Sequence, residues 1–457
     1  MKSRGESTTS LPTYRVETWG CQMNVLDGQR MAGQLEARGM RRAEEGEEAR
    51  VILLNTCMVR EKAESKVYSA LGVIARRKQE DPELVVGVTG CVAQISGEEM
   101  LERAPWVDFV AGTGHVEEIG DLVDRARRER RQALALELPE EDPVYQFKEI
   151  ARDSAFQAYV TVIEGCDQFC TFCVVPFTRG RERCRRSDEI LSELGHLVAT
   201  GYTEVTLLGQ TVNAYRDPET GSGLGELLRR AARVPGLRRL RFLTSHPRLV
   251  DDDLVAAIAE GGPIAPYFHL PAQSGADRIL GRMKRRYTAA EYLRTIEGIR
   301  RAVPGIAVSS DFIVGFPGET EEEFRATIDL VAEVRFSNVF GFRYSRRPGT
   351  AAARWASDVE IPDEVAGERL ARLLDLQTRL QRETNEELVG KEFEVLVEAE
   401  EKGKSRGRTP CNRIVHVEDG PGRVGPGEYV RVRIERGLPN SLIGKLAEET
   451  GGPERAR

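Results

Sequence analysis

The sequence predicts an α/β protein in three parts: an N-terminal parallel α/β domain, a partial (β/α)6 barrel and a small C-terminal antiparallel β-barrel. Near the N-terminus, apolar strand-like segments followed by cysteines repeat, and strand and helix patterns alternate through the middle of the chain. After residue 390, short alternating strands are separated by Gly and Pro. The 457 residues, of which 40% are hydrophobic, are too many for one ordinary core.

The N-terminal domain repeats one unit, an apolar strand that ends close to a cysteine. The repeats are Tyr14–Thr18 before Cys21, Val51–Leu54 before Cys57, and Leu84–Val88 before Cys91, with helices expected at Gln29–Arg38 and Glu61–Arg77. Parallel strands would bring the three cysteines to the carboxyl edge of the sheet, where open α/β sheets bind ligands. Burial in the core is the alternative, but it explains one such cysteine better than three. We therefore favour a three-cysteine metal site.

Strand and helix patterns alternate again in the second part. Between the two parts, Arg125–Asp142 is typical of a helix end followed by a linker. The expected strands are Tyr159–Ile163, Glu204–Leu208, Leu240–Thr244, Tyr267–Leu270, Ala307–Val314 and Val339–Tyr344, with helices at Ser187–Ala199, Ala289–Ala302 and Glu321–Val334. Six successive βα units predict a parallel sheet that curls into a partial barrel, with the active face formed by the loops after the strands.

The first of these loops carries Cys166, Cys170 and Cys173 in a C-x3-C-x2-C spacing. Three thiolates at this spacing can hold an iron-sulfur cube and leave its fourth iron open to a substrate. A structural zinc site would need a fourth ligand, and the nearest downstream histidine, His196, falls in an expected helix. A disulfide is disfavoured because the N-terminus lacks the apolar region of a signal peptide. Cys184 and Cys411 have no partner at ligand spacing, so we expect them to be non-ligands.

The C-terminal part has the pattern of a nucleic-acid-binding barrel. A charged helix at Asp363–Leu388 precedes strands at Glu392–Glu398, Arg413–Val417 and Tyr429–Ile434, which is typical of small β-barrels that bind nucleic acid. The net charge of −7 argues against indiscriminate RNA binding, so basic patches must supply any contact. The candidates are Arg179 and Arg181 after the cysteine loop and, with more support from the fold, Lys402, Lys404, Arg406, Arg408 and Arg413.

Several motifs together resemble the radical S-adenosylmethionine methylthiotransferases along nearly the whole chain. They are Gly20–Asn24, Asn55–Cys57, Gly90–Gln94, Glu164–Cys173, Val175–Arg181, Leu208–Gln210 with Asn213, His269–Gly275 and Gly315–Thr320. The resemblance implies an N-terminal methylthiotransferase domain at 12–130, a radical S-adenosylmethionine core at 152–384 and a TRAM domain at 387–449.

Within this family, the Cys-Gln-Met-Asn run at Cys21 and the segment Gly407–Val415 resemble the branch that modifies isopentenyladenosine in tRNA. Branches that act on threonylcarbamoyladenosine or on a ribosomal protein aspartate differ after the first cysteine, and they remain alternatives within the class. An RNA-binding protein with structural or electron-transfer clusters is the alternative from another class. Cys184, Ala272 and Arg346 depart from the usual family residues without removing an expected ligand.

The resemblance also implies cofactors and partners. Cys166, Cys170 and Cys173 would hold a 4Fe-4S cluster that binds and cleaves S-adenosylmethionine to give a 5'-deoxyadenosyl radical, and Cys21, Cys57 and Cys91 would hold an auxiliary 4Fe-4S cluster. The implied reaction places a methylthio group at C2 of isopentenyladenosine at tRNA position 37, next to the anticodon. The partners would be a tRNA anticodon stem-loop and an electron donor such as a flavodoxin or ferredoxin. No apolar run is long enough to span a bilayer, so we expect a cytoplasmic monomer without a membrane partner.

Polar and glycine residues after the expected strands are candidates for cosubstrate binding. Gln210, Asn213, Gln273 and Ser274 are suited to contacts with the cosubstrate or an RNA base, and turn capping is an equally weighted alternative. Gly315 and Gly318 would let the backbone approach the adenosine of S-adenosylmethionine, although a simple strand-to-helix turn has the same sequence pattern.

Overall fold

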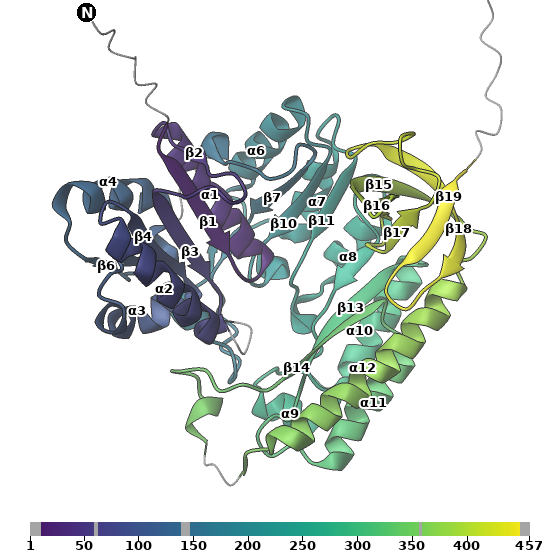
Figure 1. The fold of residues 1–457 in the computed structure, drawn as a ribbon. Coiled ribbons are helices and arrows are strands. Elements are labelled where there is room, and N and C mark those ends of the chain that lie inside the picture. The colour runs from purple at the N-terminus through teal and green to yellow at the C-terminus, as the bar shows by residue number, and fades with distance from the viewer. Residues whose placement is uncertain (1–10, 59–62, 139–146, 356–358, 448–457) are drawn as a thin grey trace, which may run out of the picture. The chain divides into compact units, whose positions relative to one another are not determined.

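The computed structural model describes residues 11–58, 63–138, 147–355 and 359–447 (Figure 1). The chain divides into two compact units. The first contains Met1–Ser154, Tyr159–Asp167 and Cys173–Arg185, and the second contains Ala155–Ala158, Gln168–Phe172 and Arg186–Arg457. Within the described ranges, no helix is long and apolar enough to cross a membrane.

A six-stranded parallel sheet forms the first unit, with strand order β2-β1-β3-β4-β5-β6. Its strands are β1 (Thr13–Thr18), β2 (Arg41–Arg42), β3 (Val51–Thr56), β4 (Val85–Gly90), β5 (Phe109–Ala111) and β6 (Ala133–Ala135). The three predicted strands are confirmed, whereas β2, β5 and β6 are too short to give a periodic signal. Strand β6 lies inside the expected linker Arg125–Asp142, so the sheet extends past the expected domain boundary at residue 130.

Helices follow the strands of this sheet. They are α1 (Gln22–Ala37), α2 (Ala63–Glu80), α3 (Cys91–Arg103), η1 (Thr113–Glu118) and α4 (Ile119–Glu129). The predicted start of the first helix at Gln29 was wrong, because α1 begins at Gln22 with polar residues that are nevertheless buried, such as Asn24 and Asp27. The predicted start of the second helix at Glu61 lies outside the described residues.

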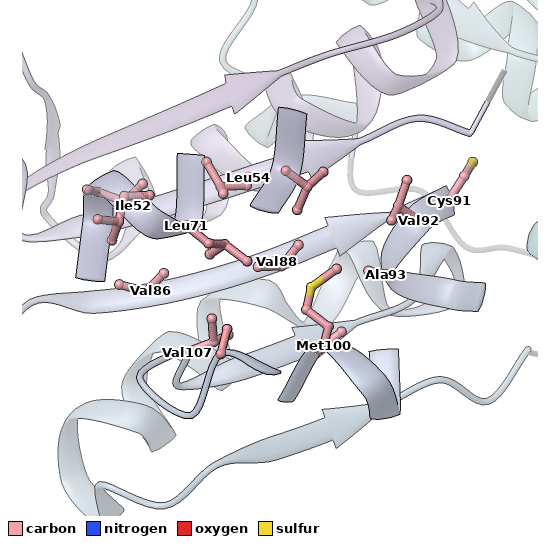
Figure 2. Packing of buried hydrophobic residues seen from close by; sticks show 14 of the residues in the cluster. Ile52, Leu54, Leu71, Val86, Val88, Cys91, Val92, Ala93, Met100 and Val107 are labelled. Carbon is pink, nitrogen blue, oxygen red and sulfur yellow. The ribbon is translucent and has the colours of Figure 1, made fainter. Parts of the chain in front are cut away.

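Apolar side chains from β3, β4 and the helices form the core on one face of the sheet. Figure 2 shows Ile52 and Leu54 of β3 beside Val86 and Val88 of β4, with Cys91 at the end of β4. All four aliphatic side chains are buried. Because both faces of a parallel sheet are covered, its strands are apolar throughout, and this is the signal that made them predictable.

The structure has the six strands expected for the partial barrel, and five of them lie wholly in the second unit. The six are β7 (Gln157–Thr161), which begins in this unit, β10 (Glu204–Leu208), β11 (Arg239–Phe242), β12 (Tyr267–His269), β13 (Ala307–Val314) and β14 (Asn338–Arg343). The pairs β10–β11, β12–β13 and β13–β14 are parallel. The helices are α6 (Ser187–Ala199), α7 (Leu224–Ala232), α8 (Asp252–Ala259), α9 (Asp277–Arg282), α10 (Ala289–Ala302), α11 (Glu321–Val334) and α12 (Asp363–Glu386).

The helices α10, α11 and α12 run along the same side of β13 and β14 (Figure 1). Thr288 and Thr320 begin α10 and α11, and each forms a capping box with a glutamate three residues later. These boxes satisfy backbone N–H groups that the first helical turn leaves unpaired. The sequence pattern therefore fixes where both helices begin.

A closed five-stranded barrel completes the second unit, in the order β15-β16-β17-β19-β18. Its strands are β15 (Glu392–Glu401), β16 (Lys404–Arg408), β17 (Ile414–Val417), β18 (Tyr429–Gly437) and β19 (Leu442–Leu446). The three predicted strands are present, and β16 and β19 were missed because they contain Lys, Arg and Gly. One pair, β17–β19, is parallel, so the barrel is not purely antiparallel.

Buried charged residues join this barrel to strands β10 and β11. Arg239, 2% exposed, pairs with Glu204 at 3.2 Å and Glu394 at 3.3 Å, and donates to the Arg408 carbonyl at 3.1 Å. Arg241 donates to the carbonyl of Thr409 at 2.9 Å and to that of Pro410 at 2.8 Å. The segment that leads from β16 to β17 is thereby fixed by charge-assisted hydrogen bonds.

Replacing Arg239 should destabilise the second unit strongly. We expect Arg239→Ala to lower the free energy of unfolding by about 3–5 kcal/mol, because Glu204 would stay buried with an incomplete charge partner. The matched control is Arg238→Ala, because Arg238 also pairs with Glu394 but is 48% exposed, and its loss should cost no more than about 1 kcal/mol. Denaturant unfolding of the full chain measures both, and equal effects would contradict this assignment.

Candidate functional site: two cysteine triplets

The first triplet lies at the carboxyl edge of the N-terminal sheet. Parallel pairing sets Thr18 of β1 beside Asn55 of β3, and Thr56 of β3 beside Gly90 of β4. The three strands therefore end at the same level, and the cysteines follow directly. Cys21 precedes α1 and is exposed, Cys57 follows β3 and is buried, and Cys91 is the first, buried residue of α3.

The first two thiols of this triplet are close together. Gly20 has φ +137°, and a Cβ there would lie 2.4 Å from the Cβ of Cys57, so the approach requires glycine. A hydrogen bond with Cys57 lowers the pKa of the Cys21 thiol to about 6, and the charge of Arg179 acts in the same direction. Burial raises the pKa of the Cys91 thiol. The charge of Arg179 lowers this pKa, and the charge of Cys21 raises it. Cys21 therefore favours the thiolate form that binds metals.

A buried charge network lies beside these thiols. Arg179 donates to Asp27 at 2.5 Å and to the side-chain oxygen of Asn24 at 3.2 Å, and both acceptors are on α1. Asn24 also donates to the backbone carbonyl of Thr56, at 2.8 Å, next to Cys57. The network thus holds Arg179, the start of α1 and the end of β3 in one arrangement. Sequence reasoning missed Asp27, because an acidic residue in a helix normally indicates an exposed face.

The second triplet follows β8 (Ile163–Glu164). Cys166 and Cys170 are each 8% exposed, and Cys173 is half-buried. Cys166 and Cys173 belong to the first unit and Cys170 to the second, where Arg285 donates to the Cys170 sulfur at 3.6 Å. Arg285 is itself buried and also donates to the Pro271 carbonyl at 2.8 Å. Arg285 lies in the cationic run Lys284–Arg286, and nothing in this sequence pattern predicted a hydrogen bond to a cysteine.

The chemistry of both donor sets fits iron-sulfur clusters. Each set consists of three thiols, and the described residues contain no group of three His, Cys, Asp or Glu side chains that could hold one metal ion. Thiolates of a cubane cluster bind separate irons, so they stand farther apart than the ligands of one ion. Guanidinium groups lie near Cys21 and Cys170, as expected beside thiolate ligands.

Among the expected cosubstrate residues, Gln273 has the geometry of a ligand-binding side chain. It is buried with φ +71°, and no described residue donates a hydrogen bond to its Oε1 atom. Its backbone is fixed by pairing with β13, where its N–H donates to the Asp311 carbonyl at 2.8 Å. An unpaired buried amide oxygen on a strained backbone fits a residue that awaits a ligand. Gln210, the first of these candidates in the sequence, lies half-buried directly after β10.

The other expected cosubstrate residues have structural partners. The amide of Asn213 donates to the His246 carbonyl at 2.9 Å and accepts from the His246 N–H at 2.8 Å, and Ser274 accepts from the Ala276 N–H at 3.2 Å. These bonds match the turn-capping alternative. A Cβ on Gly315 would lie 2.7 Å from Ala366 of α12, so close packing already accounts for this glycine. Gly318, with φ +79°, donates to the Val359 carbonyl.

The cations expected to contact RNA differ in their surroundings. Arg179 is buried against Asp27, which argues against its expected RNA contact, because breaking a buried ion pair is costly. Arg181 is 74% exposed beside Asp167. Arg413 donates to Asn385 of α12, and burial lowers its pKa, so it also faces protein.

The remaining cations lie on or next to β16. Lys404, Arg406 and Arg408 alternate with buried residues and so share its outward face, and Lys402 is exposed in the turn before this strand. Each of the three strand cations has an acidic neighbour, Glu418, Glu401 and Glu398 respectively. This row, unlike Arg179 and Arg413, remains at the surface.

Comparison with family models defines the class of the protein. Residues 160–331 match the radical SAM superfamily, and residues 386–447 match the TRAM domain. Residues 13–112, which carry the first cysteine triplet, match a family described only as uncharacterized protein family UPF0004. The segment that matches the radical SAM superfamily includes the second cysteine triplet.

Curated relatives match almost the whole chain. A tRNA-2-methylthio-N(6)-dimethylallyladenosine synthase of Cereibacter sphaeroides is 48% identical over 94% of this chain and 97% of its own length. Synthases of the same name from Mycobacterium ulcerans and Thermobifida fusca are 44% identical over 95% and 94% of the chain, covering 84% and 88% of theirs. This protein belongs to the tRNA-2-methylthio-N(6)-dimethylallyladenosine synthase family.

Solved structures support the fold. The radical S-adenosylmethionine methyltransferase TsrM from Kitasatospora setae superposes with a TM-score of 0.55 over 75% of each chain, at 15% identity. The cobalamin-dependent radical enzyme OxsB gives a TM-score of 0.50 over 81% of this chain and 56% of its own, at 14% identity. At such identities the likeness concerns the fold alone.

In cluster-free protein, Cys21 should be the most readily alkylated member of the first triplet. Its exposure and its pKa of about 6 predict half-maximal reaction with iodoacetamide near pH 6, whereas Cys91 is buried with a raised pKa. Arg179→Gln should raise the midpoint, because the lost positive charge no longer favours the thiolate. Peptide mass spectrometry across a pH series measures this.

The matched control for that measurement is Arg181→Gln, since Arg181 is exposed and pairs with Asp167 instead. It should leave the Cys21 midpoint unchanged. A wild-type midpoint of about 8.5, the value of a free cysteine, would contradict the description of the first triplet.

Proposed function

We propose that this protein is a tRNA methylthiotransferase that replaces the C2 hydrogen of N6-isopentenyladenosine, at tRNA position 37, with a methylthio group. The observation that carries the proposal is the presence of two cysteine triplets in a chain that matches the named synthases over 94% of its length. A radical SAM protein needs one triplet for its cluster, so the strand-end set Cys21, Cys57 and Cys91 requires its own explanation. An auxiliary 4Fe-4S cluster for sulfur transfer supplies it.

The residues around each triplet have distinct tasks in this proposal. When bound, the clusters supply the electron that cleaves S-adenosylmethionine and the sulfur that is transferred, while the protein positions the reactants. Arg285 orients the Cys170 ligand, and the free amide oxygen of Gln273 accepts a hydrogen bond from the cosubstrate. Arg179 and Asp27 hold the first triplet in a fixed geometry. Gln210 is a further candidate for cosubstrate binding.

The partners follow from the same chemistry. The TRAM-type barrel supports binding of the tRNA anticodon stem-loop, with Lys402, Lys404, Arg406 and Arg408 as the proposed phosphate contacts. Arg181 is the remaining candidate of the cationic run after the second triplet. Reductive cleavage requires an electron donor, for which a flavodoxin or ferredoxin is suitable. We propose that the protein acts as a monomer in the cytoplasm, where its tRNA substrate is found.

The test is the reaction itself. Anaerobically reconstituted protein, given S-adenosylmethionine, dithionite and an anticodon stem-loop with N6-isopentenyladenosine, should form 5'-deoxyadenosine and the 2-methylthio nucleoside. Cys170→Ala should abolish both products, because no radical can form. Cys57→Ala should abolish only the methylthio product. Nucleoside mass spectrometry measures both.

Parallel reactions distinguish the alternatives. Stem-loop RNA with threonylcarbamoyladenosine and the aspartate-containing ribosomal protein should remain unmodified. Methylthiolation of either one, without reaction of isopentenyladenosine, would overturn the substrate assignment. Absence of 5'-deoxyadenosine from every mixture would overturn the enzyme class and favour an RNA-binding protein with structural clusters.

A further inference from the structure

In the sheet β12–β13–β14, α12 packs on one face, and several side chains of these strands point to the opposite face. Gly341 of β14 points toward α12, since a Cβ there would meet Leu370 at 2.7 Å. Its neighbour Phe340 therefore points to the opposite face. In the parallel register Phe340 lies beside Asp311 of β13, and His269 of β12 lies beside Ser309. These side chains share the face opposite α12.

Phe340 is the conspicuous member of this face, because 44% of its surface is exposed. Phe312 and Phe336, on β13 and in the turn before β14, are fully buried and pack against each other at 5.7 Å between ring centroids. The core of the unit is thus complete without the Phe340 ring. The exposed part of the phenyl ring leaves apolar surface in water, which a bound apolar group would cover.

The polar groups beside Phe340 are held in fixed positions. One ring nitrogen of His269, Nδ1, lies 2.8 Å from the Ser309 hydroxyl, and that hydroxyl lies 2.6 Å from the Tyr267 hydroxyl. The other nitrogen, Nε2, lies 3.4 Å from the Asp311 carboxylate. The His269 and Phe340 rings meet edge to face, with centroids 5.9 Å apart. The partly exposed Asp311 carboxylate is therefore oriented and retains acceptor capacity.

An aromatic ring next to an oriented carboxylate is suited to a substituted adenine. The exocyclic N6–H of adenine is a hydrogen-bond donor, and carboxylates accept from exocyclic amino groups of bases. A hydrocarbon substituent on N6 would lie beside this hydrogen bond, where an exposed phenyl ring can cover it. The spacing of the two side chains across adjacent strands, in direct register, matches two adjacent groups of one ligand.

We propose that Phe340 and Asp311 determine specificity for the prenylated base: Phe340 packs on the dimethylallyl group, and Asp311, oriented by His269, accepts the N6–H. This inference rests on the proposed function. It assigns to the face opposite α12 the recognition of the modified nucleotide, and to the cationic barrel strand only sequence-independent contacts with the RNA backbone.

Binding of two labelled anticodon stem-loops, one with N6-dimethylallyladenosine and one with plain adenosine, tests the proposal on the reconstituted full chain. The wild type should prefer the prenylated RNA. Phe340→Ala should weaken binding of that RNA about 10-fold while changing the unmodified RNA little, because only the hydrocarbon contact is lost. Asp311→Asn should weaken both, since both bases carry an N6–H donor. Phe340→Leu, which keeps apolar area, should retain part of the preference.

The control variant is Val389→Ala, an apolar side chain that is 47% exposed in the turn between α12 and β15. It should leave both affinities unchanged, and thermal unfolding should show that every variant is folded. Adenine also occurs in S-adenosylmethionine, so the binding of S-adenosylmethionine to each variant is measured in parallel. Loss of S-adenosylmethionine binding in Phe340→Ala, with the RNA preference retained, would overturn the proposal.

The proposed function and the specificity of Phe340 are tested by different outcomes. If the wild type neither prefers the prenylated RNA nor modifies it, the proposed function fails, and this inference fails with it. If the wild type modifies and prefers that RNA, but Phe340→Ala keeps the same preference, only the specificity assignment is wrong.

Discussion

The parallel register of β1, β3 and β4 is the constraint on which the rest of the first unit depends. Cys21, Cys57 and Cys91 are far apart in the chain, and only strands of one direction, ending at one level, bring residues after them to a common edge. A slip of one residue in a parallel pair would reverse which side chains face the core. The continuous apolar packing on β3 and β4 therefore stabilises the sheet and also fixes the register that positions the thiols.

The buried pair of Arg179 and Asp27 stabilises the polar residues beyond the ends of these strands. Removing one partner of such a pair typically costs about 3–5 kcal/mol, because the other charge stays buried. Arginine suits the position better than lysine, since its planar group can donate to Asp27 and Asn24 together. The second unit uses the same device at Arg239 and Arg241, which hold the C-terminal barrel. In both units, buried guanidinium groups hold neighbouring elements together.

The long elements of this fold were predictable from the sequence, and the reasons for the failures are physical. Strands such as β3 and β4 are buried on both faces, so they are recognisable in the sequence as apolar runs. Strand β6 is short and β16 is charged, so neither gives such a run. The cysteines were identifiable because their spacing along the chain is typical of metal-ligand sets. Arg179 and Arg413 were expected at an RNA surface, because charge is visible in a sequence but its burial is not.

Other features of the site depend on tertiary contacts that no local pattern records. The free oxygen of Gln273 and the contact between Arg285 and Cys170 arise from strand pairing and loop packing. The exposure of Phe340 is equally invisible in the sequence, where it lies in an ordinary apolar strand. Its significance depends on which face of the sheet α12 covers.

We propose that the strand-end triplet forms an iron-sulfur site of its own. Mössbauer spectroscopy of the anaerobically reconstituted full chain in which Cys166, Cys170 and Cys173 are all replaced by Ala tests it most directly. This variant should retain about four irons per chain as one 4Fe-4S cluster, and further replacement of Cys57 should remove it. A triple variant that is folded but holds no cluster would show that the strand-end triplet is not an iron-sulfur site.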